Sequence, residues 1–144
     1  MYSGFEFRVR WHDQDVIKLD VAAWNGAFGG SADVYEAIGD LQSAADRLRG
    51  FPKGPRDTRE VIFGTFDRKC AGGGVKLCFH CIDGAGHAYV EAMIDSNSPS
   101  AGTIQTATLA MPVEAAAVDT FVQELQQLES DRAGTAHLKC RGIG

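Results

Sequence analysis

The chain has 144 residues, of which 44% are hydrophobic and 23% are charged, and its formal net charge is −5. A chain of this length and composition can bury a hydrophobic core without disulfides or metals, so we predict one domain over residues 1–144. The negative charge argues against a nucleic-acid partner, because phosphate binding usually requires an excess of Lys and Arg. The sequence has no signal peptide and no run of about 20 apolar residues, which predicts a cytoplasmic protein without a membrane segment.

The N-terminal part of the chain predicts three strands. Apolar and charged residues alternate over residues 5–11, which is typical of a half-buried strand with Phe5, Phe7, Val9 and Trp11 on its apolar side. Residues 16–38 predict a hairpin, because Asn25-Gly26 suits the positive backbone angles of a two-residue turn. That turn would pair Lys18 with Asp33, Asp20 with Ser31 and Trp24 with Ala27.

A short helix follows over residues 39–52, with Asp40 as its expected N-cap. Its buried side would carry Leu41, Ala44, Ala45 and Leu48. The next predicted strands cover residues 59–66, 75–82, 87–95 and 103–111, with a loop over 96–102. A second helix is predicted to begin at Pro112, and the segment after Asp131 is expected to be mobile or to add a short strand.

The predicted element order is therefore β-β-β-α-β-β-β-β-α. Short turns between neighbouring strands favour antiparallel pairing. The two helices are each apolar on one side, so both can lie on one face of the sheet. We therefore predict a two-layer α+β fold, with an antiparallel sheet of about six to seven strands, two helices on one face and an open, polar opposite face.

Two cysteines in a C-x-x-C spacing, Cys78 and Cys81, raise the question of a metal or redox centre. They lie three residues apart in a predicted strand, so their side chains should point to opposite faces. Cys70 and Cys140 do not complete a zinc-ribbon spacing. We therefore predict no metal site and no cofactor.

The strands on either side of Asp83–Gly86 predict a second hairpin, which would bring several polar side chains together. If Ile82 pairs with His87, His80 lies opposite Tyr89 and Cys78 lies opposite Glu91 on the outer face. His, Tyr and Glu can perform acid–base chemistry, although polar residues are also ordinary on the solvent side of a sheet. We assign no catalytic residue and regard an enzyme as less favoured than a binding protein. The candidate binding residues are His80, Tyr89 and Glu91, with Trp24, Asp20 and Asp33 on the first hairpin.

Five basic residues, by contrast, gather around the end of the first helix and the following loop. They are Arg47, Arg49, Lys53, Arg56 and Arg59. Such a cluster can bind an acidic group, but basic side chains at a helix C-terminus also interact favourably with the helix dipole. The second interpretation is the one we prefer.

Three segments resemble a family of small, uncharacterised bacterial α+β proteins. They are "FGGSADVYEAIGDLQSAADRLRGFP", "GGGVKLCFHCIDGAGHAYVEAMI" and "MPVEAAAVDTFVQELQQL", which contain Gly50-Phe51-Pro52, the hairpin Cys81–Val90 and Pro112-Val113-Glu114. The match runs from about Val16 to Leu128. More distantly, the layout is similar to bacterial immunity proteins that neutralise polymorphic toxins. The resemblance implies no catalytic motif. It implies that Asp83 and Gly86 form the turn of the hairpin and that His87 has a structural role.

These observations favour a small protein-binding domain, with an immunity or accessory role, that uses the open sheet face or the acidic first hairpin. Two alternatives stay open. One is an enzyme or ligand binder that uses His80, Tyr89 and Glu91 in a pocket. The other is a structural protein that forms a homodimer through an exposed strand edge or an apolar patch.

Overall fold

The computed structural model describes residues 3–98 and 104–143, so the end of the loop predicted over 96–102 and the predicted strand start at 103 lie outside the described residues. Within the described residues the chain forms eight strands and two helices. They are β1 (Gly4–His12), β2 (Val16–Trp24), β3 (Gly29–Ala37), α1 (Asp40–Leu48), β4 (Thr58–Gly64), β5 (Gly74–Cys81), β6 (Ala88–Asp95), β7 (Thr106–Val113), α2 (Ala115–Asp131) and β8 (Thr135–Lys139).

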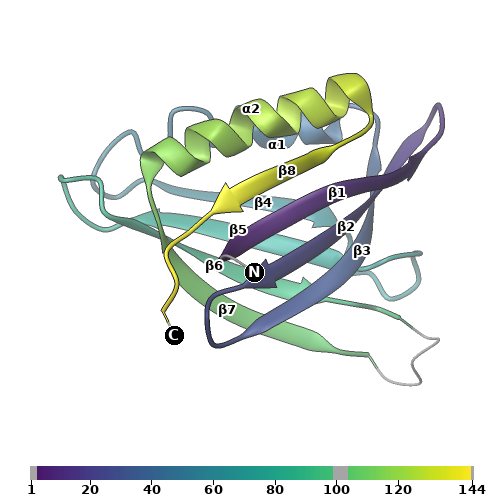
Figure 1. The fold of residues 1–144 in the computed structure, drawn as a ribbon, viewed down its shortest axis with the longest axis horizontal. Coiled ribbons are helices and arrows are strands. Elements are labelled where there is room, and N and C mark those ends of the chain that lie inside the picture. Colours follow the sequence, from purple (N-terminus) through teal and green to yellow (C-terminus); the bar gives the residue numbers. More distant parts are fainter. Residues whose placement is uncertain (1–2, 99–103, 144) are drawn as a thin grey trace.

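The strands form two antiparallel sheets rather than one. Sheet A has the order β3-β2-β1-β8 and sheet B has the order β4-β5-β6-β7 (Figure 1). The general α+β class is confirmed, but the prediction of a single sheet of six to seven strands is wrong. Alternation in a sequence marks which side of a strand is buried, but it does not say which strands are neighbours.

The apolar side of each sheet faces the other sheet and the helices. Strand β3, at the edge of sheet A, contacts all four strands of sheet B. The rings of Phe7 in sheet A and Phe63 in sheet B lie 4.7 Å apart between centroids, and Phe121 of α2 lies 5.3 Å from Phe7. The predicted helical cover of one sheet face is thus replaced by a core shared by two sheets and two helices.

The two helices pack against each other, and α2 also packs along β8 at the top of the view in Figure 1. The apolar positions predicted for α1, Leu41, Ala44, Ala45 and Leu48, are buried. In α2 the buried residues are Val118, Phe121, Val122, Leu125 and Leu128. Neither helix is long and apolar enough to cross a membrane, and this holds for every helix in the described part of the chain.

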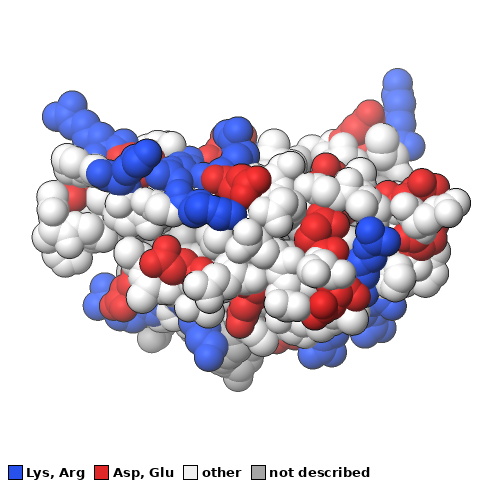
Figure 2. Space-filling view, turned by 90° about the horizontal axis from the view of Figure 1, so that it is seen from above, with Lys and Arg blue, Asp and Glu red and all other residues white. Residues whose placement is uncertain are grey.

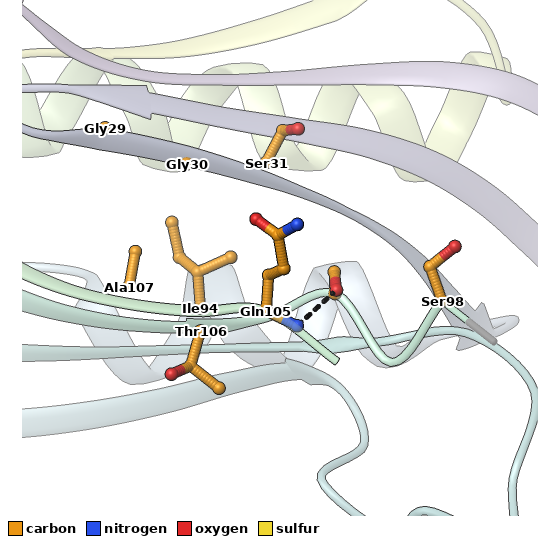
Figure 3. A pocket seen from close by; sticks show the side chains of 9 residues that line it. Gly29, Gly30, Ser31, Ile94, Ser98, Gln105, Thr106 and Ala107 are labelled. Carbon is orange, nitrogen blue, oxygen red and sulfur yellow. Dashed lines mark hydrogen bonds between the residues drawn. The ribbon is translucent and has the colours of Figure 1, made fainter. Parts of the chain in front are cut away.

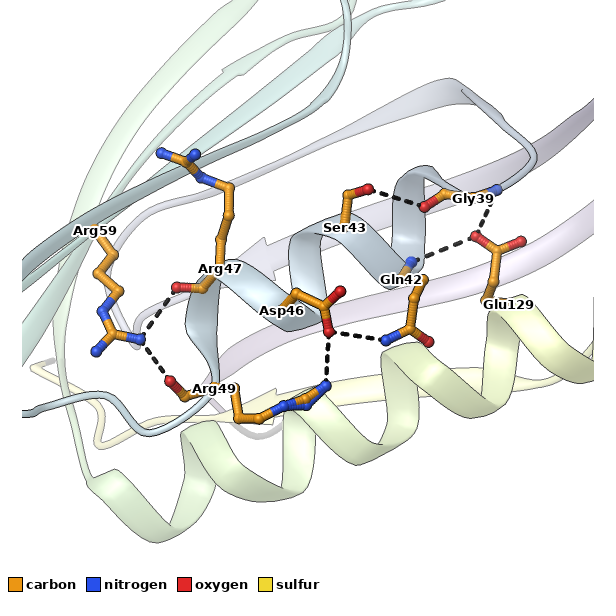
Figure 4. A network of polar contacts seen from close by, with 8 residues as sticks. All are labelled: Gly39, Gln42, Ser43, Asp46, Arg47, Arg49, Arg59 and Glu129. Atoms are coloured by element: carbon orange, nitrogen blue, oxygen red, sulfur yellow. Dashed lines mark hydrogen bonds and ion pairs between the residues drawn. The ribbon is translucent and has the colours of Figure 1, made fainter.

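Both ends of α1 are capped by side chains from other elements (Figure 4). At the start, Oε1 of Glu129 in α2 accepts hydrogen bonds from the backbone N–H groups of Gly39, Leu41 and Gln42. The expected N-cap, Asp40, instead accepts a hydrogen bond from the N–H of Ala37. A carboxylate at a helix N-terminus interacts favourably with the helix dipole, and here the distant Glu129 supplies it.

At the other end of α1, Arg59 donates hydrogen bonds to the carbonyls of Arg47 and Arg49, at 3.1 and 2.6 Å. Its guanidinium also pairs with Asp57 at 2.8 Å, which lowers the pKa of that carboxyl group. Arg59 is thus a basic side chain at the C-terminal end of a helix, which is the interpretation that we prefer for the basic cluster.

A β-bulge changes the direction of one aromatic side chain. The β1–β2 register shifts between Val9, which pairs with Leu19, and Trp11, which pairs with Lys18. Trp11 therefore lies on the same side as Lys18 and is 50% exposed, although the sequence pattern placed it on the buried side. An extra residue in one strand moves the following side chains to the other face of the sheet.

The β2–β3 hairpin has a longer loop than predicted. Trp24 pairs with Gly29, Asp20 with Asp33 and Lys18 with Tyr35, so the predicted register is wrong by two residues. The buried side chain of Asn25 explains the difference. Its Oδ1 accepts hydrogen bonds from the N–H groups of Ala27 and Phe28, and its Nδ2 donates to the carbonyl of Ala110 in β7. A shift of two keeps each side chain on its predicted face.

The β5–β6 hairpin has the predicted register. The N–H of Ile82 donates to the carbonyl of His87, His80 pairs with Tyr89, and Cys78 pairs with Glu91. Oδ1 of Asp83 accepts from the N–H groups of Ala85 and His87. The turn is thus stabilised by residues inside it, which is the kind of contact a sequence can reveal.

The C-terminal part departs from the predicted boundaries. Pro112 lies in β7 and α2 begins at Ala115, so the predicted helix start is wrong by three residues. Proline is tolerated there because its nitrogen faces away from β6, on the outer edge of the sheet. Two outcomes were expected for the segment after Asp131, mobility or a short added strand. Residues 135–139 form such a strand, β8, which pairs with β1.

Candidate functional site

The outward-facing side chains of sheet B form one surface, which we call the B face. Its cross-strand rows are set by the β4–β5–β6–β7 register. The rows are Thr58–His80–Tyr89–Pro112, Glu60–Cys78–Glu91–Ala110 and Ile62–Lys76–Met93–Thr108. Ile82 follows the last residue of β5, two residues after His80.

Three of the predicted binding residues meet on the B face. The rings of His80 and Tyr89 are stacked, with centroids 4.8 Å apart and an interplanar angle of 20°. Nε2 of His80 lies 3.1 Å from Oε1 of Glu91, but this contact does not have hydrogen-bond geometry. The contact is therefore electrostatic and is favourable when the imidazole is protonated.

The thiol of Cys78 lies in the same face, 3.8 Å from Oε2 of Glu60. Partial burial and the neighbouring Glu60 carboxylate both raise the pKa of the Cys78 thiol. A thiol that stays protonated is a poor nucleophile, so nothing here activates Cys78 for covalent chemistry. Cys81 is buried on the other side of β5, as predicted, and the described residues contain no group of three or more His, Cys, Asp or Glu side chains arranged to hold a metal ion.

Large apolar side chains are exposed on the B face. Ile62 is 49% exposed, Met93 is 42% exposed and Ile82 is 62% exposed. The sequence pattern marked these outer positions as part of a polar solvent face and gave them no role. Their position becomes informative only when the strands are known to be neighbours, because Ile62 lies in β4, Met93 lies in β6 and Ile82 directly follows β5.

The other predicted residues, Asp20, Asp33 and Trp24, lie on the outer side of sheet A and so do not join the B face. Asp20 faces Asp33 directly across the strands. Burial of Asp20 and repulsion from Asp33 raise the pKa of the Asp20 carboxyl group. Each carboxylate has a basic partner: Arg10 lies 3.1 Å from Asp20, and Lys18 lies 3.8 Å from Asp33.

Trp24 is half-buried, and its ring lies over Gly29. A Cβ atom at Gly29 would lie 2.8 Å from that ring, so the glycine makes room for it. Among the large hydrophobic side chains described in the strands of sheet A, the most exposed is instead Trp11, whose row continues through Lys18 to Tyr35. The alternating pattern could not reveal Trp11, since a bulge leaves no mark in it.

His87 does not join the B face cluster either. Its Nδ1 lies 2.6 Å from Oδ2 of Asp83, within the turn. The same contact lowers the pKa of the Asp83 carboxyl group. The contact of His87 is thus with its own turn, the segment in which the family resemblance implies a structural role for this residue.

A second feature, missed in the sequence, is a cleft of about 370 Å³ between α1 and the outer edge of β4. Glu36 of β3 projects into it and is only 4% exposed. Its Oε1 accepts a hydrogen bond from the N–H of Gly64. Burial, followed by the nearby carboxyl groups of Asp40 and Glu129, raises the pKa of Glu36 to about 8. Glu36 is therefore mostly neutral at pH 7.

Glu36 could have been noticed in the sequence, because it occupies an inward position of β3 in line with Ala32 and Val34. An acidic residue at an inward strand position requires a partner or a raised pKa. The pattern could not identify the partner, since Gly64 belongs to the other sheet.

Another cleft, of about 360 Å³, lies where the start of β3 passes over β6 and β7 (Figure 3). Ile94, Gln105 and Ala107 point toward β3, whereas Thr106 points away. Gly30 favours this close approach, because a Cβ atom at this position would lie 3.0 Å from the Ala107 side chain, which is a tight contact. The glycine-rich stretch thus serves close packing of the two sheets.

Charge is mixed on the side of the molecule that carries α2. Figure 2 shows a group of Lys and Arg side chains toward the upper left and Asp and Glu side chains interspersed with uncharged residues elsewhere. This side therefore offers no large surface of one sign. Searches of protein-family models, curated proteins and solved structures found no match to the chain.

Proposed function

We propose that the protein is a small protein-binding domain that takes its partner on the B face, in the immunity or accessory role that the family resemblance implies. The observation that carries the proposal is the exposure of Ile62 and Met93 on the same face as the stacked rings of His80 and Tyr89, with the row of Glu60 and Glu91 between them. Protein interfaces combine apolar, aromatic and Met side chains with a polar rim, and the B face has this composition.

The charges favour the B face over sheet A and indicate the chemistry of the partner. On sheet A, Asp20 and Asp33 already have basic partners within the chain. On the B face, Glu60 and Glu91 are exposed, whereas Lys76 is half-buried. An excess of exposed carboxylates favours a partner with basic residues at the rim of its interface.

The enzyme alternative requires a pocket over His80, Tyr89 and Glu91. The five clefts described in the structure are lined by residues other than these three. The self-association alternative uses the same exposed apolar residues, so it is an outcome of the experiment below.

Affinity capture with quantitative mass spectrometry tests the proposal. The tagged wild-type chain, Met93→Glu and Asp33→Lys would be incubated with lysate of the source organism. We expect one stoichiometric protein that Met93→Glu loses by about tenfold or more and that Asp33→Lys retains. Loss with Asp33→Lys alone would move the interface to sheet A. Capture of no protein would contradict the proposal. So would capture of the chain itself alone, with sedimentation showing that the purified chain forms a dimer.

A further inference from the structure

The outer edge of β4 has unpaired backbone groups in a cleft. Hydrogen bonds from Cys81 to Asp57 and from Thr65 to Gly73 fix which residues of β4 bond to β5. By alternation, Thr58, Glu60, Ile62 and Gly64 direct their backbone N–H and C=O groups away from β5.

Two of these outward groups are covered by side chains. Nε of Arg47 donates to the carbonyl of Glu60 at 2.9 Å, and Glu36 accepts from the N–H of Gly64. Ile62 lies between them, and within the described residues no hydrogen bond to its N–H or C=O is found. An edge strand with free backbone groups is a template for another strand.

The cleft along this edge is lined by Glu36, Asp40, Ser43, Arg47, Glu60 and Ile62, among others. Glu36 is neutral, so the charged side chains of the lining are the carboxylates of Asp40 and Glu60 and the guanidinium of Arg47, and this excess of one carboxylate favours an occupant with basic side chains. Glu36 holds the Gly64 N–H as a neutral acid, and such hydrogen bonds are weaker than those of a carboxylate. At this end of the edge the cover consists of one neutral side chain from the other sheet.

We propose that the cleft between α1 and β4 binds an extended, basic peptide segment of a protein partner, which adds to sheet B beside β4 and exchanges backbone hydrogen bonds with Ile62. Strand addition of this kind takes affinity from the backbone and selectivity from the side chains. The proposal goes beyond the B face, because the edge can be occupied with or without a partner on that face.

The test uses the full chain and three synthetic peptides. The first is acetyl-Val-Arg-Val-Arg-Val-amide, the second is N-methylated at its central Val, and the third has Glu in place of both Arg residues. Binding would be followed by titration with two-dimensional NMR of the ¹⁵N-labelled chain. We expect saturable binding of the first peptide, with the largest amide shifts at Ile62 and Gly64. We expect binding about tenfold or more weaker for the other two.

Matched proline variants locate the edge. Ile62→Pro removes the outward N–H without removing a bond to β5 and should lose the peptide. Thr108→Pro makes the same change on β7, the opposite edge of sheet B, and should retain it. If Ile62→Pro fails to fold, the N-methylated peptide gives the same information on the wild-type chain.

Three results would overturn the proposal: equal affinity for the N-methylated peptide, equal loss with Thr108→Pro, or no saturable binding at about 1 mM peptide. If the chain forms a dimer and Ile62→Pro makes that dimer dissociate, the edge binds a second copy of the chain. That result would also overturn the proposal. Met93→Glu separates the two proposals, since it should lose the partner of the B face and keep the peptide.

Discussion

The two edge strands of sheet B are closed in different ways. On β7, the buried Asn25 donates to the carbonyl of Ala110, the backbone N–H of Arg141 donates to the carbonyl of Pro112, and Pro112 itself has no N–H to offer. On β4, the cover consists of the side chains of Arg47 and Glu36, and Ile62 between them stays open.

This difference concerns one end of the β7 edge, at Ala110 and Pro112. Further along, the two edges are alike: within the described residues the outward backbone groups of Thr108 on β7 have no such cover, as those of Ile62 on β4 have none. Backbone and buried groups on β7 can move only if the loop that carries them moves. The side chains that cover β4 are Arg47 of α1 and Glu36 of β3, each through one hydrogen bond, and Glu36 can change its protonation state. An edge that is covered only by side chains protects against aggregation yet stays accessible to a specific strand.

The largest expected effect concerns Glu36, which covers the β4 edge. Its pKa is about 8 in the folded chain and 4.5 in the unfolded reference, so the folded state binds the proton more tightly. The contribution of Glu36 is fully present below pH 4.5 and is lost as the pH rises through about 8, on the order of 5 kcal/mol in total. We expect Glu36→Gln to remove this loss, so that the variant is more stable than wild type at pH 9 in urea unfolding.

The matched control for Glu36 is Glu60→Gln, which removes a carboxylate from an exposed position lining the same cleft. It should leave the slope of stability against pH close to wild type. A similar slope change in both variants would mean that the overall charge, and not the buried carboxyl group, causes the effect.

The second prediction concerns Asn25, which closes the β7 edge. Asn25→Ala removes three side-chain hydrogen bonds and leaves the carbonyl of Ala110 and two N–H groups without these partners. We expect the free energy of unfolding to fall by about 3 kcal/mol, measured by urea unfolding at pH 7. The comparison variant is Asp83→Ala in the exposed β5–β6 turn, with an expected loss of about 1 kcal/mol. Equal losses would show that Asn25 acts only within its own turn.

The third prediction concerns α1, which forms the wall of the cleft beside β4. Glu129→Ala removes the carboxylate that caps the start of this helix and should cost about 1.5 kcal/mol. Thermal unfolding and hydrogen exchange of the Gly39 and Leu41 amides would measure it. The control is Gln127→Ala. Gln127 lies at an exposed position of α2, the helix that also carries Glu129, and its replacement should cost less than about 0.5 kcal/mol. Unchanged exchange at Leu41 in Glu129→Ala would contradict the assignment of the cap.

The smallest expected effect is that of Arg47→Ala. Arg47 is exposed and its hydrogen bond to the Glu60 carbonyl is open to water, so a loss of about 0.5 kcal/mol is expected in urea unfolding. Because the variant uncovers a further backbone carbonyl on the β4 edge, it should bind the basic peptide at least as tightly as wild type. Weaker binding would mean that Arg47 contacts the peptide and does not merely cover the strand.

Part of the candidate site was predictable because it depends on local contacts. The cluster of His80, Tyr89 and Glu91 follows from the alternation of two adjacent strands and from the turn at Asp83. The B face as a whole was not predictable, since Ile62 comes from a strand whose place beside β5 is set by the assembled sheet. Asp20, Asp33 and Trp24 were placed on the correct side of their strands but belong to a different surface.

The sequence by itself determined the two helices, the buried side of most strands and the register of the β5–β6 hairpin. These features depend on residue periodicity and on hydrogen bonds between residues close in the chain. Only the tertiary structure decided the division into two sheets, the loop at Asn25, the exposed position of Trp11 and the buried carboxyl group of Glu36. Each of these depends on partners far away in the chain, such as Ala110 for Asn25 and Gly64 for Glu36, and a linear pattern carries no information about such pairs.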